Sequence, residues 1–438
     1  MLKTFRKAFQ IEDLRKRIMY TFLMLIVVRV GSQLPTPGVN SAYIQNFFTQ
    51  QTGEAFNFFS AFTGGSFEKM SIFALSITPY ITSSIIMQLL TIAIPKLEEM
   101  QKDGEDGRKK IQSITRYVTV LLALVESTAM AVGFGRQGLL EEYNFVNAAV
   151  VVVTLTAGSA FLMWIGERIT EKGIGNGISI VLLINILSRV PSDFTTLYNK
   201  FISGKSIAKG GLAAGIILAI IILLVVFVII LQDGERRIAV QYSQKMQGRR
   251  AVGGHSTNIP LKVNTAGVIP VIFASSLMQT PIVIASFLGK GNGSGIGSEI
   301  LRGMNSGNWC NPSQLKYSWG LIVYILLTVF FAYFYTSITF NPLEIANNMK
   351  KSGGFIPGIR PGKPTVDYLT KILNKIIFIG ACGLIIVQVI PFFFNGIFGA
   401  SVSFGGTSLI IIVGVVLETI KQMESQMLVR NYKGFLNK

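Results

Sequence analysis

Long uninterrupted runs of apolar residues dominate the chain, and few segments show the striped pattern of a soluble domain. Residues 211–231 contain no polar side chain, and residues 321–331 are apolar except for Tyr324 and Thr328. At about 1.5 Å per residue, a helix of about 20 residues crosses the roughly 30 Å hydrocarbon core of a bilayer. We therefore predict an all-α membrane protein. Its ten predicted spans are 18–34, 71–94, 114–135, 146–165, 177–191, 211–232, 266–288, 317–339, 372–394 and 404–420.

Ten spans divide into five and five, which suggests two halves, 1–200 and 201–421, followed by a tail at 422–438. An odd number of spans per half would place a duplicated unit inverted in the membrane, as in many transport proteins. Two of the spans, 177–191 and 404–420, are short for a helix that faces lipid. We expect these two helices in the interior, where neighbouring helices shield them.

One apolar segment, 55–70, is too short to span and is interrupted by Gly64 and Gly65. Non-helical backbone at membrane depth survives only where protein buries it or where it lines water. The segment is therefore either a re-entrant element on the outer side or an interfacial helix lying at the surface.

Charge separates the two sides of the predicted bundle. The chain of 438 residues has a net charge of +18, a mean hydropathy of +0.51 and only 14% charged residues, against about 25% in soluble domains. Of its 40 Lys and Arg, 29 fall on the side of the membrane that carries both termini, and 9 fall on the other. The positive-inside rule therefore predicts that both termini are cytoplasmic.

The residues needed for catalysis or metal binding are missing from the spans. The only histidine, His255, lies in a loop, and Cys310 and Cys382 have no zinc-binding spacing. The sequence has no phosphate-binding loop of the Walker type. Glu126 lies near mid-span without an obvious partner, whereas ion-coupled transporters usually carry paired ionisable groups there. We predict no enzyme activity, catalytic residue, metal or cofactor, and we favour a passive conduit over a solute transporter or an intramembrane enzyme.

Two predicted cytoplasmic loops are too elaborate to be simple connectors. In loop 232–265, apolar residues alternate with small or polar ones at two places, a period that indicates a pair of short strands. Arg249 and Arg250 lie at the tip between these strands. In loop 340–371, Asn341 and Pro342 are typical of a helix start.

The same loop 340–371 then holds Arg360 on a turn rich in Pro and Gly. Both loops indicate docking surfaces for an acidic protein or for RNA phosphate, although a solvated basic loop that only sets the topology would show the same charge. Few aromatic residues interleave with the basic ones, so we expect no sequence-specific reading of nucleic acid.

Motifs spread over nearly the whole chain resemble those of the SecY family, the channel subunits of the Sec protein translocon. They are RVG at 29–31, PTPG at 35–38, SIFAL at 71–75, TPYI at 78–81, QLL at 88–90, GIGNGIS at 173–179, LKVN at 261–264, AGVIP at 266–270, GIRPGKP at 358–364 and GGTSL at 405–409.

The resemblance implies a protein-conducting channel between two inverted five-helix halves, which opens across the membrane and sideways into lipid. A ring of apolar side chains would form its constriction, and such a ring can dewet and resist ions. The matching positions are Ile81, Ile85, Leu182, Ile186, Ile272 and Ile411. Leu182 departs from the isoleucine of some relatives, an exchange that a soft apolar ring tolerates.

Segment 55–70 matches the family's plug, a short re-entrant helix that seals the outer funnel. The plug residues implied are Phe58, Phe59, Phe62, Gly64 and Gly65. A gate through which signal sequences leave would lie between the second and seventh spans. Its polar candidates are Gln88, Ser275, Ser276 and Gln279.

The resemblance also implies partners that supply energy and support. Arg249, Arg250 and Arg360 match positions that contact the motor protein SecA or the ribosome. SecE would clamp the two halves and SecG would often be present. The cargo would be preproteins with apolar signals, handled in the lipid bilayer of a bacterial cell membrane.

Overall fold

The computed structural model describes residues 9–40, 63–135, 138, 140, 142–203, 207–242, 245–247, 250–252, 256–287, 295–398 and 406–436. Long helices account for most of these residues, so the predicted helical class is confirmed. The long helices are α2 (Glu12–Gly31), α5 (Thr78–Ala93), α7 (Glu105–Phe134), α8 (Phe145–Lys172), α9 (Gly177–Phe201), α10 (Ile207–Asp233), α11 (Ile269–Phe287), α13 (Trp319–Thr339), α15 (Lys363–Phe398) and α16 (Gly406–Leu436).

Each of the ten predicted spans overlaps one of these helices. Seven helices in the described part are long and apolar enough to cross a membrane. An eighth span is added if α5 and α6 (Pro95–Lys102), which meet at a bend of 103°, are counted as one. Helix α2 carries Arg15, Lys16, Arg17 and Arg29 within its last 18 residues, a charge that lowers its mean hydropathy. The protein is therefore a helical membrane protein with several spans.

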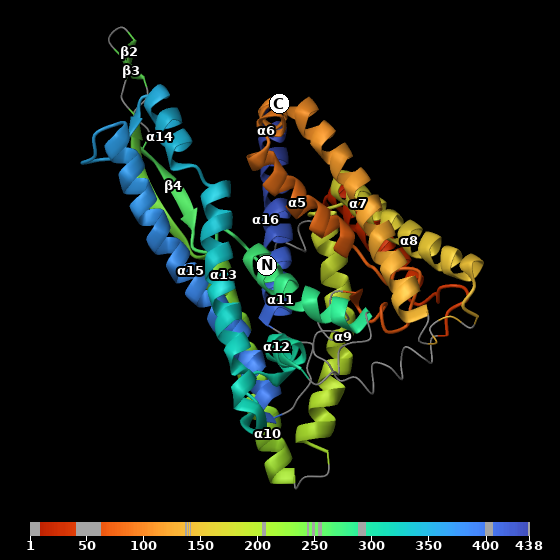
Figure 1. The fold of residues 1–438 in the computed structure, drawn as a ribbon. Helices are drawn as coiled ribbons and strands as arrows, with labels where there is room; N and C mark the ends of the chain where they lie inside the picture. The colour runs from red at the N-terminus through yellow and green to blue at the C-terminus, as the bar shows by residue number, and fades with distance from the viewer. Residues whose placement is uncertain are drawn as a thin grey trace.

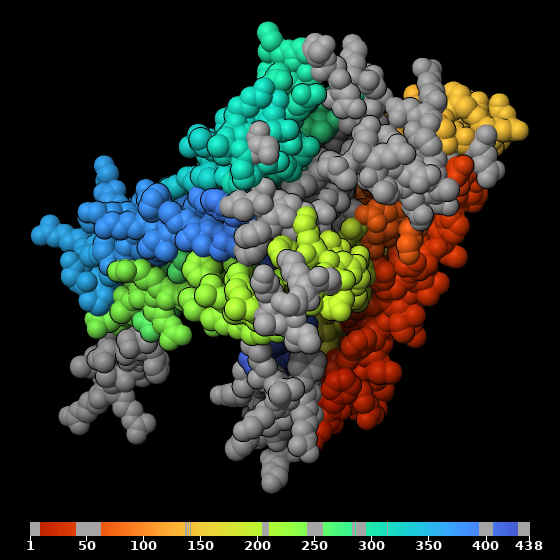
Figure 2. Space-filling view, turned by 90° about the horizontal axis from the view of Figure 1, so that it is seen from below, coloured from red at the N-terminus to blue at the C-terminus, as the bar shows by residue number. Residues whose placement is uncertain are grey.

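The helices form two groups that follow the order of the chain. Helices α2, α5, α7, α8 and α9 pack on one another, and so do α10, α11, α13, α15 and α16. The two groups occupy opposite sides of the molecule in both the ribbon and the view from below (Figure 1, Figure 2). Contacts between the groups are made by α9 with α16 and α10, and by α7 with α11.

Two expected short spans are longer in the structure. The span predicted at 177–191 belongs to the 25-residue helix α9, which continues through Pro191. The span predicted at 404–420 belongs to the 31-residue helix α16, which continues into the expected tail. The prediction that these two helices are short was therefore wrong, and their length gives no reason to place them in the interior. Both nevertheless contribute buried residues to the centre of the bundle.

The second predicted span, 71–94, also differs from expectation. Its helix begins only at Thr78, because residues 71–77 fold into turns. These turns are buried, and the backbone N–H of Ile72 donates to the carbonyl of Leu34 at 2.9 Å. Non-helical backbone therefore enters the apolar part of the protein with its hydrogen bonds satisfied by neighbouring segments, as membrane depth requires.

Loops 232–265 and 340–371 together form a small β layer. Strand β1 (Glu235–Tyr242) pairs antiparallel with β4 (Ser256–Lys262), which confirms the predicted pair of strands. A third strand, β5 (Gly354–Phe355), comes from the second loop and pairs with the other edge of β1. At the tip, β2 (Lys245–Gln247) pairs with β3 (Arg250–Val252). The layer lies alongside one end of α15, and its tip, formed by β2 and β3, projects beyond the helices (Figure 1).

Candidate functional site

Helix α9 begins at a cap built by the motif at 173–179. The Asn176 side chain accepts hydrogen bonds from the backbone N–H groups of Ile178 and Ser179 at 3.2 and 3.4 Å. Such a cap satisfies donors that the first helical turn leaves unpaired. Gly175 precedes it with φ of +82°, a left-handed conformation that favours glycine. The cap fixes where the helix starts and therefore which face of α9 points inward.

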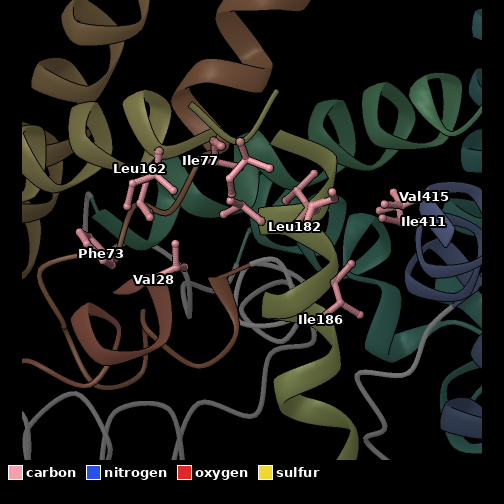
Figure 3. Close-up of a cluster of buried hydrophobic side chains, with 12 residues drawn as sticks. Val28, Phe73, Ile77, Leu162, Leu182, Ile186, Ile411 and Val415 are labelled. Atoms are coloured by element: carbon pink, nitrogen blue, oxygen red, sulfur yellow. The ribbon is translucent and has the colours of Figure 1, made fainter. Parts of the chain in front are cut away.

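Four of the six predicted ring residues meet in one apolar cluster. Leu182 and Ile186 on α9 and Ile411 on α16 are buried in it, and Ile81 on α5 packs against it. Figure 3 shows Leu182 and Ile186 with Ile411 among the buried side chains. Since α5 and α9 belong to one half and α16 to the other, the cluster lies where the halves meet. The structure thus brings together apolar side chains from both halves.

The remaining two ring candidates lie outside this cluster of described residues. Ile85, one turn after Ile81 on α5, is buried, and Ile272 on α11 is half-buried. Ile272 has Val271 and Ala274 as buried neighbours on the same helix. The assignment of all six residues to one constriction stays a prediction.

The segment 63–77, which precedes α5, is buried inside the bundle. Thr63, Ser66 and Met70 are at most 3% exposed. The Arg189 guanidinium of α9 forms an ion pair with Glu68 of this segment at 2.6 Å. The described part of the segment is therefore enclosed by protein, which favours a re-entrant element over a helix lying on the surface.

Only part of the predicted plug can be placed. Phe58, Phe59 and Phe62 lie outside the described residues. Gly64 and Gly65 both have positive φ, +64° and +80°. They therefore form a turn that non-glycine residues would adopt only with strain. The predicted plug helix itself is not tested by this part of the chain.

The gate candidates are divided between two kinds of environment. Gln88 and Ser276 are exposed, whereas Ser275 and Gln279 are buried. The Ser275 hydroxyl donates to the carbonyl of Val271 in its own helix at 2.8 Å. Oε1 of Gln279 has no hydrogen-bond partner within the part of the chain that the structure describes.

The polar contact that crosses between the halves near Gln88 reaches the eighth predicted span rather than the seventh. The Tyr335 hydroxyl of α13 donates to Oε1 of Gln88 on α5 at 3.4 Å. Helix α13 packs against α11. The seventh and eighth predicted spans are therefore neighbours, and the eighth makes the contact with α5. Sequence reasoning missed Tyr335, since nothing in the local pattern distinguishes it from other aromatic residues of the span.

The two basic loops form one layer rather than two separate surfaces. Arg250 is the first residue of β3 at the tip, and Arg249 lies outside the described residues. Arg360 is exposed on a turn between Gly358 and Gly362, and its carbonyl accepts a hydrogen bond from the Thr365 hydroxyl at 2.9 Å. The turn is therefore held from within, as the Pro and Gly pattern predicted.

The loop between α11 and α13 contains the short helix α12, which contacts both of these helices. Glu299 on α12 (Ile296–Met304) accepts hydrogen bonds from Lys316 at 2.8 Å and from the Tyr317 hydroxyl at 3.1 Å. These hydrogen bonds lower the pKa of Glu299 from its ordinary value. Next to this network, Trp309 is buried and donates from Nε1 to the Gly303 carbonyl at 2.8 Å.

Possible metal ligands are dispersed in the structure. Within the described ranges, no three His, Cys, Asp or Glu side chains lie close enough together to hold a metal ion. Cys310 and Cys382 are free thiols. The arrangement offers an apolar centre, polar residues at the edge between the halves and a β layer that carries basic residues.

Comparison with known sequences agrees with this arrangement. The model of the SecY family matches residues 71–420. A protein translocase subunit SecY from Corynebacterium glutamicum is 43% identical over 453 residues, which cover 98% of this chain and 99% of that protein. A protein translocase subunit SecY from Streptomyces galbus is also 43% identical, over the full length of both chains.

Solved structures share the fold at low sequence identity. A SecY channel studied for the role of its plug domain has a TM-score of 0.61 at 19% identity, covering 94% of this chain and 92% of that one. Sec61 from a canine ribosome–channel complex has a TM-score of 0.56 at 17% identity, with the same coverage. The sequence relatives span the whole chain, so this protein belongs to the SecY family of protein translocase subunits, which are non-enzymatic protein-conducting channels.

Proposed function

We propose that this chain is the central channel of a Sec translocon, through which unfolded secretory polypeptides cross the membrane. The observation that carries the proposal is the apolar cluster between the halves, to which α5, α9 and α16 contribute Ile81, Leu182, Ile186 and Ile411. A narrow apolar passage can exclude water and ions and still yield to a polypeptide. The ring would be completed by Ile85 and Ile272.

The proposal includes the full ten-span architecture, with two inverted five-helix halves at 1–200 and 201–421 and a tail at 422–438. The correspondence of ten helices with ten predicted spans supports it. The distribution of Lys and Arg supports cytoplasmic termini in a bacterial cell membrane. Phe58, Phe59, Phe62, Gly64 and Gly65 would belong to a plug on the outer side.

Signal and transmembrane segments would leave sideways between α5 and the pair α11–α13. Gln88, Ser275, Ser276 and Gln279 are the polar residues proposed for this gate. The hydrogen bond between Gln88 and Tyr335 supports its position, because it joins helices of different halves. Interhelical polar contacts in membranes average only about 0.6 kcal/mol, so the gate could open without a large cost.

The driving force would come from partners. SecA or the ribosome would dock on the layer that carries Arg249, Arg250 and Arg360, and the exposed, internally held turn around Arg360 supports this assignment. SecE and SecG would complete the membrane complex, and signal-bearing preproteins would be the cargo. No sequence-specific contact with nucleic acid is proposed.

Photocrosslinking from positions 81 and 272 tests the proposal directly. A photoreactive residue is placed at each position, in membranes that hold a translocation-arrested precursor. We expect both positions to label the mature part of the precursor, and only when an energised partner is present. Position 155, which is buried on α8 away from the proposed passage, serves as the control. Absence of label from 81 and 272 while translocation proceeds would refute the channel assignment.

A further inference from the structure

Helix α12 and the short helix η3 (Pro312–Ser318) carry large apolar side chains that no described part of the chain covers. On α12, Ile296 is 84% exposed and Ile300 is 48% exposed, and Leu315 on η3 is 67% exposed. Helix α12 and the start of α13 lie at the rim of the molecule in the view from below (Figure 2). Apolar surface of this kind is unfavourable in water. Contiguous exposed apolar patches mark binding surfaces, so we looked for the partner that this one fits.

The exposed side of α12 is fixed against the start of α13. Ile296, Ile300 and Gly303 are spaced at i, i+4 and i+7, so they share one side of the helix. A Cβ at Gly303 would overlap the Trp319 indole, and a Cβ at Gly320 would overlap the Gly303 carbonyl oxygen. Only glycine permits the two backbones to approach so closely. Trp319 therefore continues the apolar surface of α12 onto α13.

The same surface then continues along a membrane span. Ile322, Leu326 and Phe330 follow Trp319 at i+3, i+7 and i+11, so the four residues lie along one face of α13. Ile322, Leu326 and Phe330 are each at least 60% exposed, and the helix that contains them is long and apolar enough to cross a membrane. In a bilayer this face contacts lipid, and a Trp at the end of a span is typical of the membrane interface. The apolar side of α12 therefore borders a surface that lipid covers.

The charged side chains near α12 lie on a different side of the helix. Glu299 accepts a hydrogen bond from Lys316 at 2.8 Å and lies 3.9 Å from the Arg302 guanidinium. All three side chains are about half exposed or more. A helix with one apolar and one charged side is typical of helices that lie in the headgroup region of a bilayer.

We propose that α12 is an interfacial anchor whose partner is phospholipid. Ile296 and Ile300 insert between headgroups and acyl chains in the leaflet that α13 enters at Trp319, and the charged side of α12 faces headgroups and water. A protein partner would meet lipid at the edge of α13, whereas lipid covers both surfaces without a boundary. Because α12 also contacts α11, the anchor fixes the depth at which α11 ends and α13 begins. The inference rests on α13 as a membrane span and does not require the proposed channel.

Spin labels at single cysteines test the depth of α12. Ile296→Cys or Ile300→Cys, each combined with Cys310→Ser and Cys382→Ser, leaves one thiol for a nitroxide. The full chain is kept in its membrane complex and reconstituted into phosphatidylcholine vesicles. Collisions of the nitroxide with oxygen, which concentrates in lipid, are compared with collisions with a water-soluble nickel chelate. We expect a ratio of oxygen to nickel collisions several-fold higher at 296 and 300 than at Arg302→Cys in the same background.

Arg302 is the matched control because it lies on the charged side of the same helix. Its side chain is about half exposed, as is Ile300, so the two labels differ in direction more than in burial. Equally low ratios at 296, 300 and 302 would place α12 in water and overturn the inference. Protection of 296 and 300 from both oxygen and the nickel chelate would show that protein covers the surface, and this outcome would overturn the inference as well.

A charge on the apolar side should expel the anchor from the bilayer. The nitroxide is moved to Leu315→Cys in the same background, because Lys316 and Tyr317 of η3 both bond to Glu299 and should follow α12. Ile300→Asp should raise nickel collisions at 315 several-fold, since a carboxylate is strongly disfavoured among acyl chains. Ile300→Leu keeps the side apolar and should leave the collisions unchanged. If Ile300→Asp also leaves them unchanged, α13 alone sets the depth of this loop, and α12 is not an anchor.

Discussion

The Tyr335 hydroxyl on α13 donates a hydrogen bond of 3.4 Å to Oε1 of Gln88 on α5. The two residues belong to different halves of the chain, and both lie at the exposed edge of the bundle. A hydrogen bond of this length is at the weak end of the range for such contacts. Thermal motion can therefore break this polar contact between the halves, and the packing of α7 on α11 remains beside it.

Removing the Tyr335 hydroxyl should make lateral exit easier. With a contact worth about 0.6 kcal/mol, Tyr335→Phe is expected to shift the ratio of membrane-inserted to translocated product by roughly threefold for a segment of borderline hydrophobicity. The measurement is the glycosylation or protease-protection pattern of that segment. Tyr333→Phe is the control, since Tyr333 donates to the Asn374 carbonyl within its own half at 3.2 Å. Equal shifts in the two variants would contradict a role at the gate.

A polar side chain in the apolar cluster should make the idle protein leaky to ions. Leu182→Ser places a hydroxyl where dewetting is expected to block ions, so the conductance of the idle complex in a planar bilayer should increase. Leu155→Ser is the comparison, because Leu155 is fully buried in a different cluster on α8. Both variants leave cavities that cost about 2–5 kcal/mol in well-packed cores. A leak in both variants would assign the effect to general destabilisation.

Gly175 should tolerate substitution less well than a glycine of similar φ in open space. Gly175→Ala would combine the strain of a left-handed residue, about 1–2 kcal/mol, with a Cβ lying 2.7 Å from Ile180 Cδ1 and 3.0 Å from Thr419 Oγ1. Gly358 has φ of +80°, and a Cβ added there would meet no atom of the described chain within 4 Å, so Gly358→Ala isolates the strain. The midpoints of thermal unfolding in detergent should fall in the order wild type, Gly358→Ala, Gly175→Ala.

Acid should loosen the loop around α12 that joins α11 to α13. Because the pKa of Glu299 is lowered by hydrogen bonds from Lys316 and Tyr317, its contribution to stability is present above its unfolded pKa and is lost as the pH falls through the folded pKa. Trp309 fluorescence, recorded with Trp164→Phe and Trp319→Phe, should report the change. Glu299→Gln should abolish this pH dependence. A transition of the same size in Glu299→Gln would assign it to another group.

Patterns with a short repeat were sufficient to predict several elements. Alternation of apolar residues predicted the pairing of β1 with β4, because one face of that ladder packs on α15 and must be apolar. Asn341 was predicted as the start of α14 (Pro342–Lys351), and its side chain accepts from the N–H groups of Leu343 and Glu344. In each of these elements the deciding interaction lies within a few residues or within one hairpin.

Elements decided by distant contacts could not be predicted in this way. The predicted span ended at residue 191, yet α9 continues through Pro191 to Phe201, and the Thr195 hydroxyl donates to the Pro191 carbonyl at 2.9 Å. Residues 71–77 are as apolar as a helix, but their conformation depends on partners such as Asn185 that are far away in sequence. The contacts of Tyr335 and Arg189 are equally long-range, so residue type alone did not reveal them.

The third strand of the β layer, β5, affects the order in which the layer is assembled during synthesis. Strands β1 and β4 can pair as soon as residue 262 leaves the ribosome, but Gln241 and Tyr242 find their partners Phe355 and Gly354 only after α11 and α13 have been synthesised. Contacts between distant segments form late because the intervening chain must first be placed. A chain halted before residue 354 would therefore present an unfinished layer, so a completed three-stranded layer marks a chain in which α11 and α13 have already been made.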